Sequence, residues 1–151
     1  MSRPEKFRII KSPPLFSLFK PAGIPMSELG RVDLTLAEYE AIRLADYNGL
    51  DHQKAADQME ISRPTFTRLI DKARKKTAAL LIEGKSLIIE GGNIHFNENV
   101  IKCLDCGHLF RLNIGTESDR CEACGSTHIS DFALKFGHGR CCRYRGGRNK
   151  K

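Results

Sequence analysis

Residues 51–82 constrain the fold of this chain most, because two helix starts and a tight turn follow one another within a short distance. Asp51 and Ser62 are residue types whose side chains accept hydrogen bonds from the free N–H groups of a helix's first turn. Pro64 fits the first turn of the second helix, where a missing N–H has no cost. The stretch therefore predicts two helices joined by a turn at Glu60.

The second of these helices is predicted to continue to Ile82, with Gly84 ending it. At 100° per residue its apolar side chains fall within a stripe about 120° wide, made up of Phe66, Leu69, Ile70, Ala73, Thr77, Leu80 and Leu81. Arg68, Lys72 and Lys75 lie on the opposite side, with Thr65 at its edge. One face is expected to be buried, and the other to be free to meet phosphate and base.

Further elements are predicted on both sides of this pair. Thr35 and Glu38 have the spacing of a capping box, which predicts a third helix upstream. Residues 86–90 and 93–96 flank two glycines, which predicts a hairpin. The fold class expected is α+β, with a three-helix helix-turn-helix domain and C-terminal hairpin over residues 34–97, followed by a small β zinc ribbon.

The spacing around Glu60 also fits a helix-turn-helix. Ala56 lies four positions before it, and Phe66 and Leu69 lie six and nine after it, at the positions that such a motif buries. The turn residue commonly has a positive φ, so a non-glycine residue there has a cost of roughly 1 kcal/mol. An ordinary helical hairpin with solvated cations is the alternative interpretation.

The net charge of +7 is unevenly distributed. Residues 62–84 hold six cations and two acids, whereas residues 35–61 hold two cations and six acids. Residues 1–33, with five of the six prolines, are expected to form a basic arm, and residues 133–151 a basic tail. This segregation favours a polyanion partner that contacts the two ends of the chain and the second helix.

The partner expected is double-stranded DNA, since the second helix of such a motif enters the major groove. Arginine can form two hydrogen bonds to guanine, worth ~1–3 kcal/mol of discrimination, whereas lysines further along meet phosphate. Two half-sites usually require a homodimer, to which Leu80, Leu81 and the following hairpin could contribute. Candidates for base contacts are Arg63, Thr65, Thr67 and Arg68, and those for phosphate contacts are Lys72, Lys75 and Lys76.

Two Cys-x-x-Cys knuckles, separated by fourteen residues, lie within residues 98–132. Such turns each place two thiolates on one edge of a metal, and two turns complete a structural Zn²⁺ site with no open position. Iron in a rubredoxin-like site and a thiol–disulfide pair are the alternatives. His108 and His128 are expected not to bind the metal, since four cysteines already fill its positions. The predicted ligands are Cys103, Cys106, Cys121 and Cys124.

The surroundings of these cysteines are acidic, since residues 103–131 hold five acids and two cations. A zinc ion held by four thiolates adds further negative charge, which argues against DNA contact by this segment. Two other roles fit this segment better. The metal could hold a small β-unit together, or the segment could contact a protein such as RNA polymerase. In the tail, the adjacent Cys141 and Cys142 are poorly placed to bind one metal together, so a second metal site is not favoured. The favoured interpretation of the tail is an arm that neutralises phosphate, and the alternative is a tail that only increases solubility.

A family resemblance rests on Phe19–Pro25, Leu34–Thr35, Tyr39–Leu44, Ser62–Phe66, Ala73–Lys76, Glu83–Leu87 and Ile89–Gly92. The helical segment resembles the region-4 helix-turn-helix of sigma factors, with the pattern LTxxExxAIxL, AAxxM and SRxTFxR. Roughly residues 3–96 are similar to a family of uncharacterised bacterial and archaeal predicted DNA-binding proteins. This resemblance implies a DNA-binding regulator without a known target. The chain departs from the family at Glu60 and at Lys54, where an acidic residue is usual. The cysteine segment resembles zinc ribbons only at the level of the fold.

The expected function is therefore a sequence-specific DNA-binding transcriptional regulator with a structural zinc site. An RNA-binding or ribosome-associated zinc-ribbon protein is the alternative, because basic tails and zinc ribbons are common there. An enzyme is not expected, since the chain has no P-loop, GxGxxG, HExxH or persuasive triad. Neither an apolar run of ~20 residues nor a signal peptide is present, so no membrane contact and a cytoplasmic location are expected.

Overall fold

The computed structural model describes residues 7–113 and 116–136. The chain divides into two compact units, one formed by Met1–Ile9 with Pro14–Ile94 and the other by Ile10–Pro13 with His95–Lys151. The described residues form a mixed α+β structure with three α-helices and several small sheets. The predicted α+β class is therefore confirmed.

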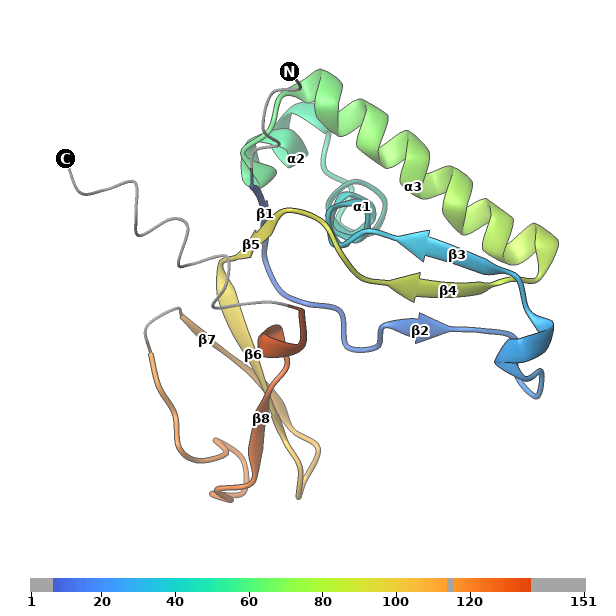
Figure 1. The fold of residues 1–151 in the computed structure, drawn as a ribbon. Helices are drawn as coiled ribbons and strands as arrows, with labels where there is room; N and C mark the ends of the chain where they lie inside the picture. The colour runs from blue at the N-terminus through green and yellow to red at the C-terminus, as the bar shows by residue number, and fades with distance from the viewer. Residues whose placement is uncertain (1–6, 114–115, 137–151) are drawn as a thin grey trace. The chain divides into compact units, whose positions relative to one another are not determined.

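The first unit contains a three-stranded sheet that joins distant parts of the chain (Figure 1). Its strands are β2 (Leu18–Phe19), β3 (Arg31–Leu34) and β4 (Ser86–Ile89), and a short 3-10 helix, η1 (Met26–Glu28), lies between the first two. β4 is central, antiparallel to β2 and parallel to β3. Val32, Leu34, Leu87 and Ile89 alternate along β3 and β4 and are buried, so one sheet face belongs to the core.

Helix α1 (Leu36–Ile42) begins at the predicted capping box. The backbone N–H of Glu38 donates to Thr35 Oγ1 at 3.1 Å, and Thr35 N–H donates back to Glu38 Oε2 at 3.0 Å. The helix continues as a π-helical turn, η2 (Arg43–Tyr47). Both free N–H groups are thus satisfied locally, which explains why the sequence located this helix start.

Helices α2 (His52–Met59) and α3 (Arg63–Glu83) also begin at the predicted caps. Asp51 accepts from Lys54 N–H at 2.8 Å, and Ser62 accepts from Thr65 N–H at 3.3 Å. Between the helices Glu60 has φ 55°, the left-handed conformation expected of the turn residue. The sequence prediction of two capped helices around a left-handed residue is confirmed.

Replacing Glu60 by glycine is expected to stabilise the protein by roughly 1 kcal/mol, because glycine adopts a positive φ without a Cβ penalty. Chemical denaturation followed by circular dichroism would measure the change. A matched Glu83→Gly variant, in the last turn of α3, is expected to destabilise instead. Loss of stability in the Glu60 variant would contradict a strained turn.

The core of this unit lies between the sheet and the helices. Its fully buried side chains include Leu36, Leu44, Met59, Phe66 and Ile70. The buried residues of α3 all lie between Phe66 and Ala73, and Leu81 and Ile82 are 75% and 85% exposed. The predicted apolar stripe is therefore wrong at Leu81, because the last turns of α3 pack against less of the core than its first turns.

The predicted hairpin over residues 86–96 is wrong. β4 pairs with β2 and β3, whereas β5 (Ile94–Phe96) pairs with β1 (Arg8–Ile10). The intervening backbone bonds elsewhere, since Glu90 N–H donates to Leu34 O and Leu36 N–H donates to Gly91 O. The segment predicted as a basic, partly ordered arm over residues 1–33 supplies β1, β2 and most of β3.

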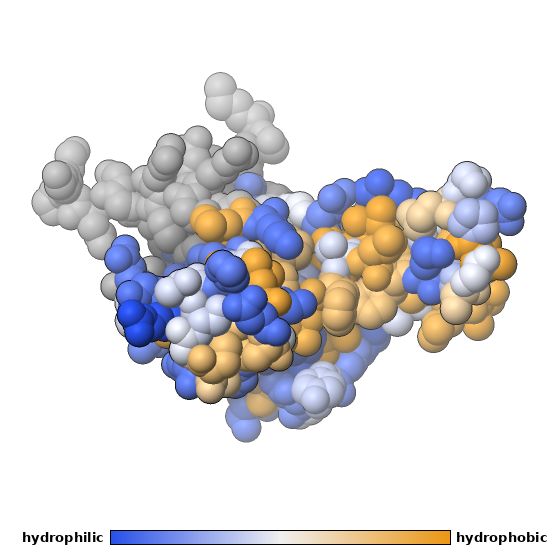
Figure 2. All heavy atoms as spheres, turned by 90° about the horizontal axis from the view of Figure 1, so that it is seen from below, coloured by the Kyte–Doolittle hydropathy of each residue, from blue (hydrophilic) through white to orange (hydrophobic). Residues whose placement is uncertain are grey.

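Exposed apolar side chains gather around β2 and η1. Figure 2 shows them as orange spheres on the face seen from below. They include Leu15, Phe16, Leu18, Phe19, Ile24 and Met26.

None of the helices in the part of the chain that the structure describes is long and apolar enough to cross a membrane.

The second unit is a small antiparallel sheet that holds all four knuckle cysteines close together. Its strands are β6 (Glu98–Cys103), β7 (Leu109–Asn113) and β8 (Ile129–Asp131), in the order β7-β6-β8. A 3-10 helix, η3 (Ala133–Phe136), follows β8. One cluster of its small core consists of Ile101, Cys103, Phe110 and Cys121, flanked by Leu112 and Ile129, and Phe96, Val100 and Ala133 are buried as well.

Candidate functional site

The four cysteines of the knuckles converge on one point. All four sulfur atoms lie within 4.8 Å of one another, and Cys103 and Cys121 are buried while Cys106 and Cys124 are exposed. The Sγ atoms of Cys103 and Cys124 are 3.6 Å apart, and those of Cys106 and Cys121 are 3.7 Å apart. The cluster could therefore hold a metal ion, as the spacing of the cysteines predicted.

The sulfur–sulfur distances suit a tetrahedral metal. A tetrahedron with zinc–sulfur distances of ~2.3 Å has sulfur–sulfur edges of ~3.8 Å. The two short distances join the two knuckles, each pairing a cysteine of one knuckle with a cysteine of the other. Four sulfurs fill all positions of a tetrahedral ion, so the donor set fits a closed site.

Backbone N–H groups of the knuckles point at the sulfurs. Cys106 N–H donates to Cys103 Sγ at 3.5 Å, and Ala123 N–H donates to Cys121 Sγ at 3.3 Å. The N–H of Cys106 is the main cause that lowers the pKa of Cys103 to about 6. These bonds follow from the Cys-x-x-Cys turn itself, because each turn directs its N–H groups toward its first sulfur.

The cysteines of the cluster differ in pKa. The N–H of Ser126 lowers the pKa of Cys124, but the Cys106 sulfur and the loss of water around the cluster outweigh it and raise this pKa to about 12. Thiols so close together repel one another once they are ionised. A divalent cation can replace these protons, which couples metal binding to proton release.

The two histidines near the knuckles have other contacts. His108 stacks on Phe110 with ring centroids 5.9 Å apart, and His128 Nδ1 lies 3.3 Å from Asp105 Oδ1. Asp105 also accepts a hydrogen bond from the Ser126 hydroxyl, which is the main cause that lowers its pKa, followed by His128. Asp105 thus ties one knuckle to the segment after the other, a role that the sequence did not indicate.

The second candidate site is the cationic face of α3, the helix that Figure 1 draws along one side of the first unit. Arg68, Lys72 and Lys75 are exposed on one face of this helix, and Arg63 is exposed in its first turn. Among the residues that the structure describes, these four side chains have no ion-pair partner within 4.0 Å. Their charge is therefore available to an external anion.

Thr65 and Thr67, the other two residues of α3 that are predicted to contact bases, interact with polar side chains of the protein itself. Thr65 Oγ1 lies 2.7 Å from Ser62 Oγ, and Thr67 Oγ1 lies 2.9 Å from His52 Nδ1. His52 also meets the edge of the Phe66 ring, with centroids 5.4 Å apart. His52 therefore fixes α2 against the start of α3, and no spacing rule in the sequence pointed to it.

Lys76 differs from the other lysines of the helix. Its Nζ lies 2.8 Å and 3.1 Å from the two carboxylate oxygens of Glu38, whose side chain is only 5% exposed. Glu38 thus serves both the cap of α1 and a pair with α3. The phosphate contact predicted for Lys76 remains a prediction, with part of its charge already compensated.

Arg74 is also paired, with Asp46 at 2.7 Å on η2. This hydrogen bond is the main cause that lowers the pKa of Asp46 from 3.8. A lowered carboxyl pKa gives stability that is present above the unfolded-state pKa and is lost as the pH falls through the folded-state value.

An Asp46→Asn variant is therefore expected to lose a few tenths of a kcal/mol at pH 7, since both partners are partly exposed. The difference from the wild type should shrink as the pH falls below 3.8 and vanish below the lowered folded-state pKa, where Asp46 is neutral in both states. Urea titrations at pH 7 and pH 3 would measure it. A difference that grew toward pH 3 would contradict the pairing.

Taken together, the fold defines a two-unit α+β protein with a cationic helix in one unit and a four-cysteine cluster in the other. Residues 1–97 match the family described as Protein of unknown function DUF134, and the chain belongs to this family. The family match ends before the first cysteine of the cluster, so the second unit lies almost wholly outside it.

Full-length relatives carry the name UPF0251 protein. The chain is 46% identical over 149 residues to the one of Chloroherpeton thalassium, covering 97% of this chain and 99% of the relative. It is 47% identical over 111 residues to that of Pelotomaculum thermopropionicum, covering 74% and 84%. For that of Clostridium botulinum strain Loch Maree the identity is 38% over 157 residues, covering 99% and 100%.

Proposed function

We propose that this protein binds double-stranded DNA in a sequence-specific manner and regulates transcription. The observation that carries the proposal is the arrangement of α2 and α3 around Glu60, with Arg68, Lys72 and Lys75 exposed on one face of α3. This arrangement suits a helix-turn-helix, in which the second helix lies in the major groove. Arg63 and Arg68 would meet base edges, and Lys72 and Lys75 phosphates.

The packing of the helix pair supports this proposal over an ordinary helical hairpin. The residues at the positions that a helix-turn-helix buries, Ala56, Phe66 and Leu69, are all buried. Glu60 adopts the left-handed conformation that the turn requires. A hairpin in a bundle would need neither feature.

The four cysteines are proposed to hold a structural Zn²⁺. Their sulfur–sulfur distances of 3.6 and 3.7 Å fit a tetrahedral ion, and four protein ligands leave no open position for substrate. The proposed role of the site is to hold together a unit whose own apolar core is small. A homodimer on DNA is proposed as well, because one recognition helix covers few bases.

Selection of genomic DNA fragments by the purified full-length protein tests the central proposal. We expect one sequence class to be enriched, with two half-sites about one helical turn apart if a dimer binds. Competition with structured RNA is the matched control. Absence of an enriched sequence, or equal affinity for structured RNA, would contradict sequence-specific DNA binding and favour the RNA-binding alternative.

A further inference from the structure

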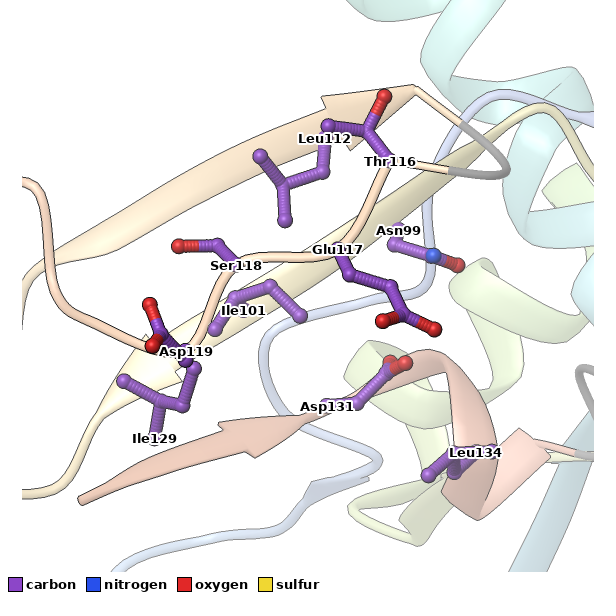
Figure 3. A pocket seen from close by; sticks show the side chains of 10 residues that line it. All are labelled: Asn99, Ile101, Leu112, Thr116, Glu117, Ser118, Asp119, Ile129, Asp131 and Leu134. Atoms are coloured by element: carbon purple, nitrogen blue, oxygen red, sulfur yellow. The ribbon is translucent and has the colours of Figure 1, made fainter. Parts of the chain in front are cut away.

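The sheet of the second unit carries a hollow of about 760 Å³ on one face (Figure 3). Its floor is apolar and is formed by Ile101, Leu112 and Ile129 from the three strands, with Leu134 of η3 at one end. This hollow is separate from the cysteine cluster, since none of the four cysteines lines it. It is large enough to receive one or two side chains.

The polar part of the lining carries acids and no cation. Glu117, Asp119 and Asp131 contribute carboxylates, and Figure 3 shows their side chains around the hollow. Asp131 is partly satisfied, because its Oδ1 accepts from Ala133 N–H at 2.8 Å. Glu117 and Asp119 are exposed and have no hydrogen bond or ion pair with the described residues. Two carboxylates are therefore available beside an apolar floor.

A buried polar atom adds an independent observation. Asn99 lines the hollow, and its Oδ1 is buried without a hydrogen-bond partner in the part of the chain that the structure describes. A buried acceptor without a donor is energetically unfavourable.

We propose that this hollow binds a basic segment of a partner protein. An apolar side chain of the segment rests on the floor of Ile101, Leu112 and Ile129, and flanking lysine or arginine side chains pair with Glu117 and Asp119. Charge complementarity selects this occupant, because residues 103–131 hold five acids and two cations. The same charge disfavours nucleic acid, so the proposal does not depend on DNA binding by α3.

The test uses the full-length protein and a fluorescein-labelled nonapeptide of lysines with two central leucines. Fluorescence anisotropy measures its affinity, and a peptide with glycines in place of the leucines is the comparison. Glu117→Gln is expected to weaken binding about threefold, and Glu117→Gln with Asp119→Asn about tenfold. The matched control is Glu122→Gln, an exposed acid of the same unit outside the hollow, which should change nothing.

A second pair of variants tests the apolar lining at the end of the hollow without risk to the fold. Leu134 and Leu104 are 62% and 64% exposed, and only Leu134 lines the hollow. Leu134→Ser should weaken the leucine peptide severalfold and leave the glycine peptide unchanged, whereas Leu104→Ser should affect neither. Equal effects of Glu117→Gln and Glu122→Gln, or equal affinity for both peptides, would overturn the proposal.

The basic tail of this chain is the competing occupant. A labelled peptide of residues 137–151, whose sequence holds six cations, is therefore included in the same experiment. These residues lie outside the described part of the chain. Tighter binding of this peptide than of the leucine nonapeptide, with the same dependence on Glu117, would assign the hollow to the tail and overturn a partner protein.

Discussion

Replacing Arg68 by alanine is expected to remove much of the preference of this protein among duplex DNA sequences. Arg68 is exposed on α3 without an ion-pair partner among the described residues, so its guanidinium is available for two hydrogen bonds to guanine. Loss of ~1–3 kcal/mol corresponds to roughly a 5- to 150-fold loss of discrimination at one position of the site. Competition assays with single-base variants of the selected DNA would measure it.

The chain offers a matched control on the same helix. Arg74→Ala removes the same charge, but Arg74 lies on a different face and pairs with Asp46. This variant should leave base preference unchanged. Lys72→Ala should weaken binding to all sequences alike and lower the slope of log affinity against log salt by about 0.9. If Arg68→Ala behaved like Lys72→Ala, Arg68 would contact phosphate and the proposed base contact would be wrong.

Removal of the proposed zinc ion is expected to unfold the second unit and to leave the first unit folded. The second unit buries few apolar side chains, and two members of its central cluster, Cys103 and Cys121, are themselves proposed ligands, whereas the first unit has a larger buried core of its own. Structural zinc contributes apparent binding free energies of ~10–16 kcal/mol in zinc-finger peptides, so we expect the folding of this unit to depend on the proposed ion. Amide NMR spectra before and after addition of a strong chelator would show which residues lose their native signals.

A variant at Cys124, an exposed cysteine and proposed ligand, tests this prediction more sharply. Truncating an exposed side chain normally changes stability by less than about 0.5 kcal/mol. Cys124→Ala is nevertheless expected to abolish one-to-one zinc binding and to unfold the second unit, because it opens the ligand set. Leu104→Ala, at an exposed position next to Cys103, should have little effect. Metal analysis that found iron, or a chelator-resistant second unit, would contradict structural zinc.

Several features of this protein could be predicted from its sequence because they depend on residues close together in the chain. The caps at Thr35, Asp51 and Ser62 each satisfy N–H groups three positions away, so residue type and spacing determine them. The left-handed turn at Glu60 follows from the two helices that flank it. Each Cys-x-x-Cys knuckle is likewise a local turn.

Other features depended on pairing between distant segments. Glycines at 91 and 92 suggested a hairpin, but β4 pairs with strands more than fifty residues upstream. Backbone hydrogen bonds are alike for every partner strand, so the choice depends on packing of the whole core. The hollow lined by Glu117 and Leu134 also required the relative placement of three strands and η3, which periodicity does not provide.

The sequence by itself therefore determined the helix starts, the left-handed turn, the order of charge along α3 and the set of four cysteines, since each is encoded within a few residues. Only the tertiary structure decided which of those charges are available. It pairs Lys76 with the buried Glu38 and Arg74 with Asp46, and it leaves Arg68, Lys72 and Lys75 exposed. The reason is physical: an ion pair depends on distance in space, and these partners lie 28 and 38 positions apart in the chain.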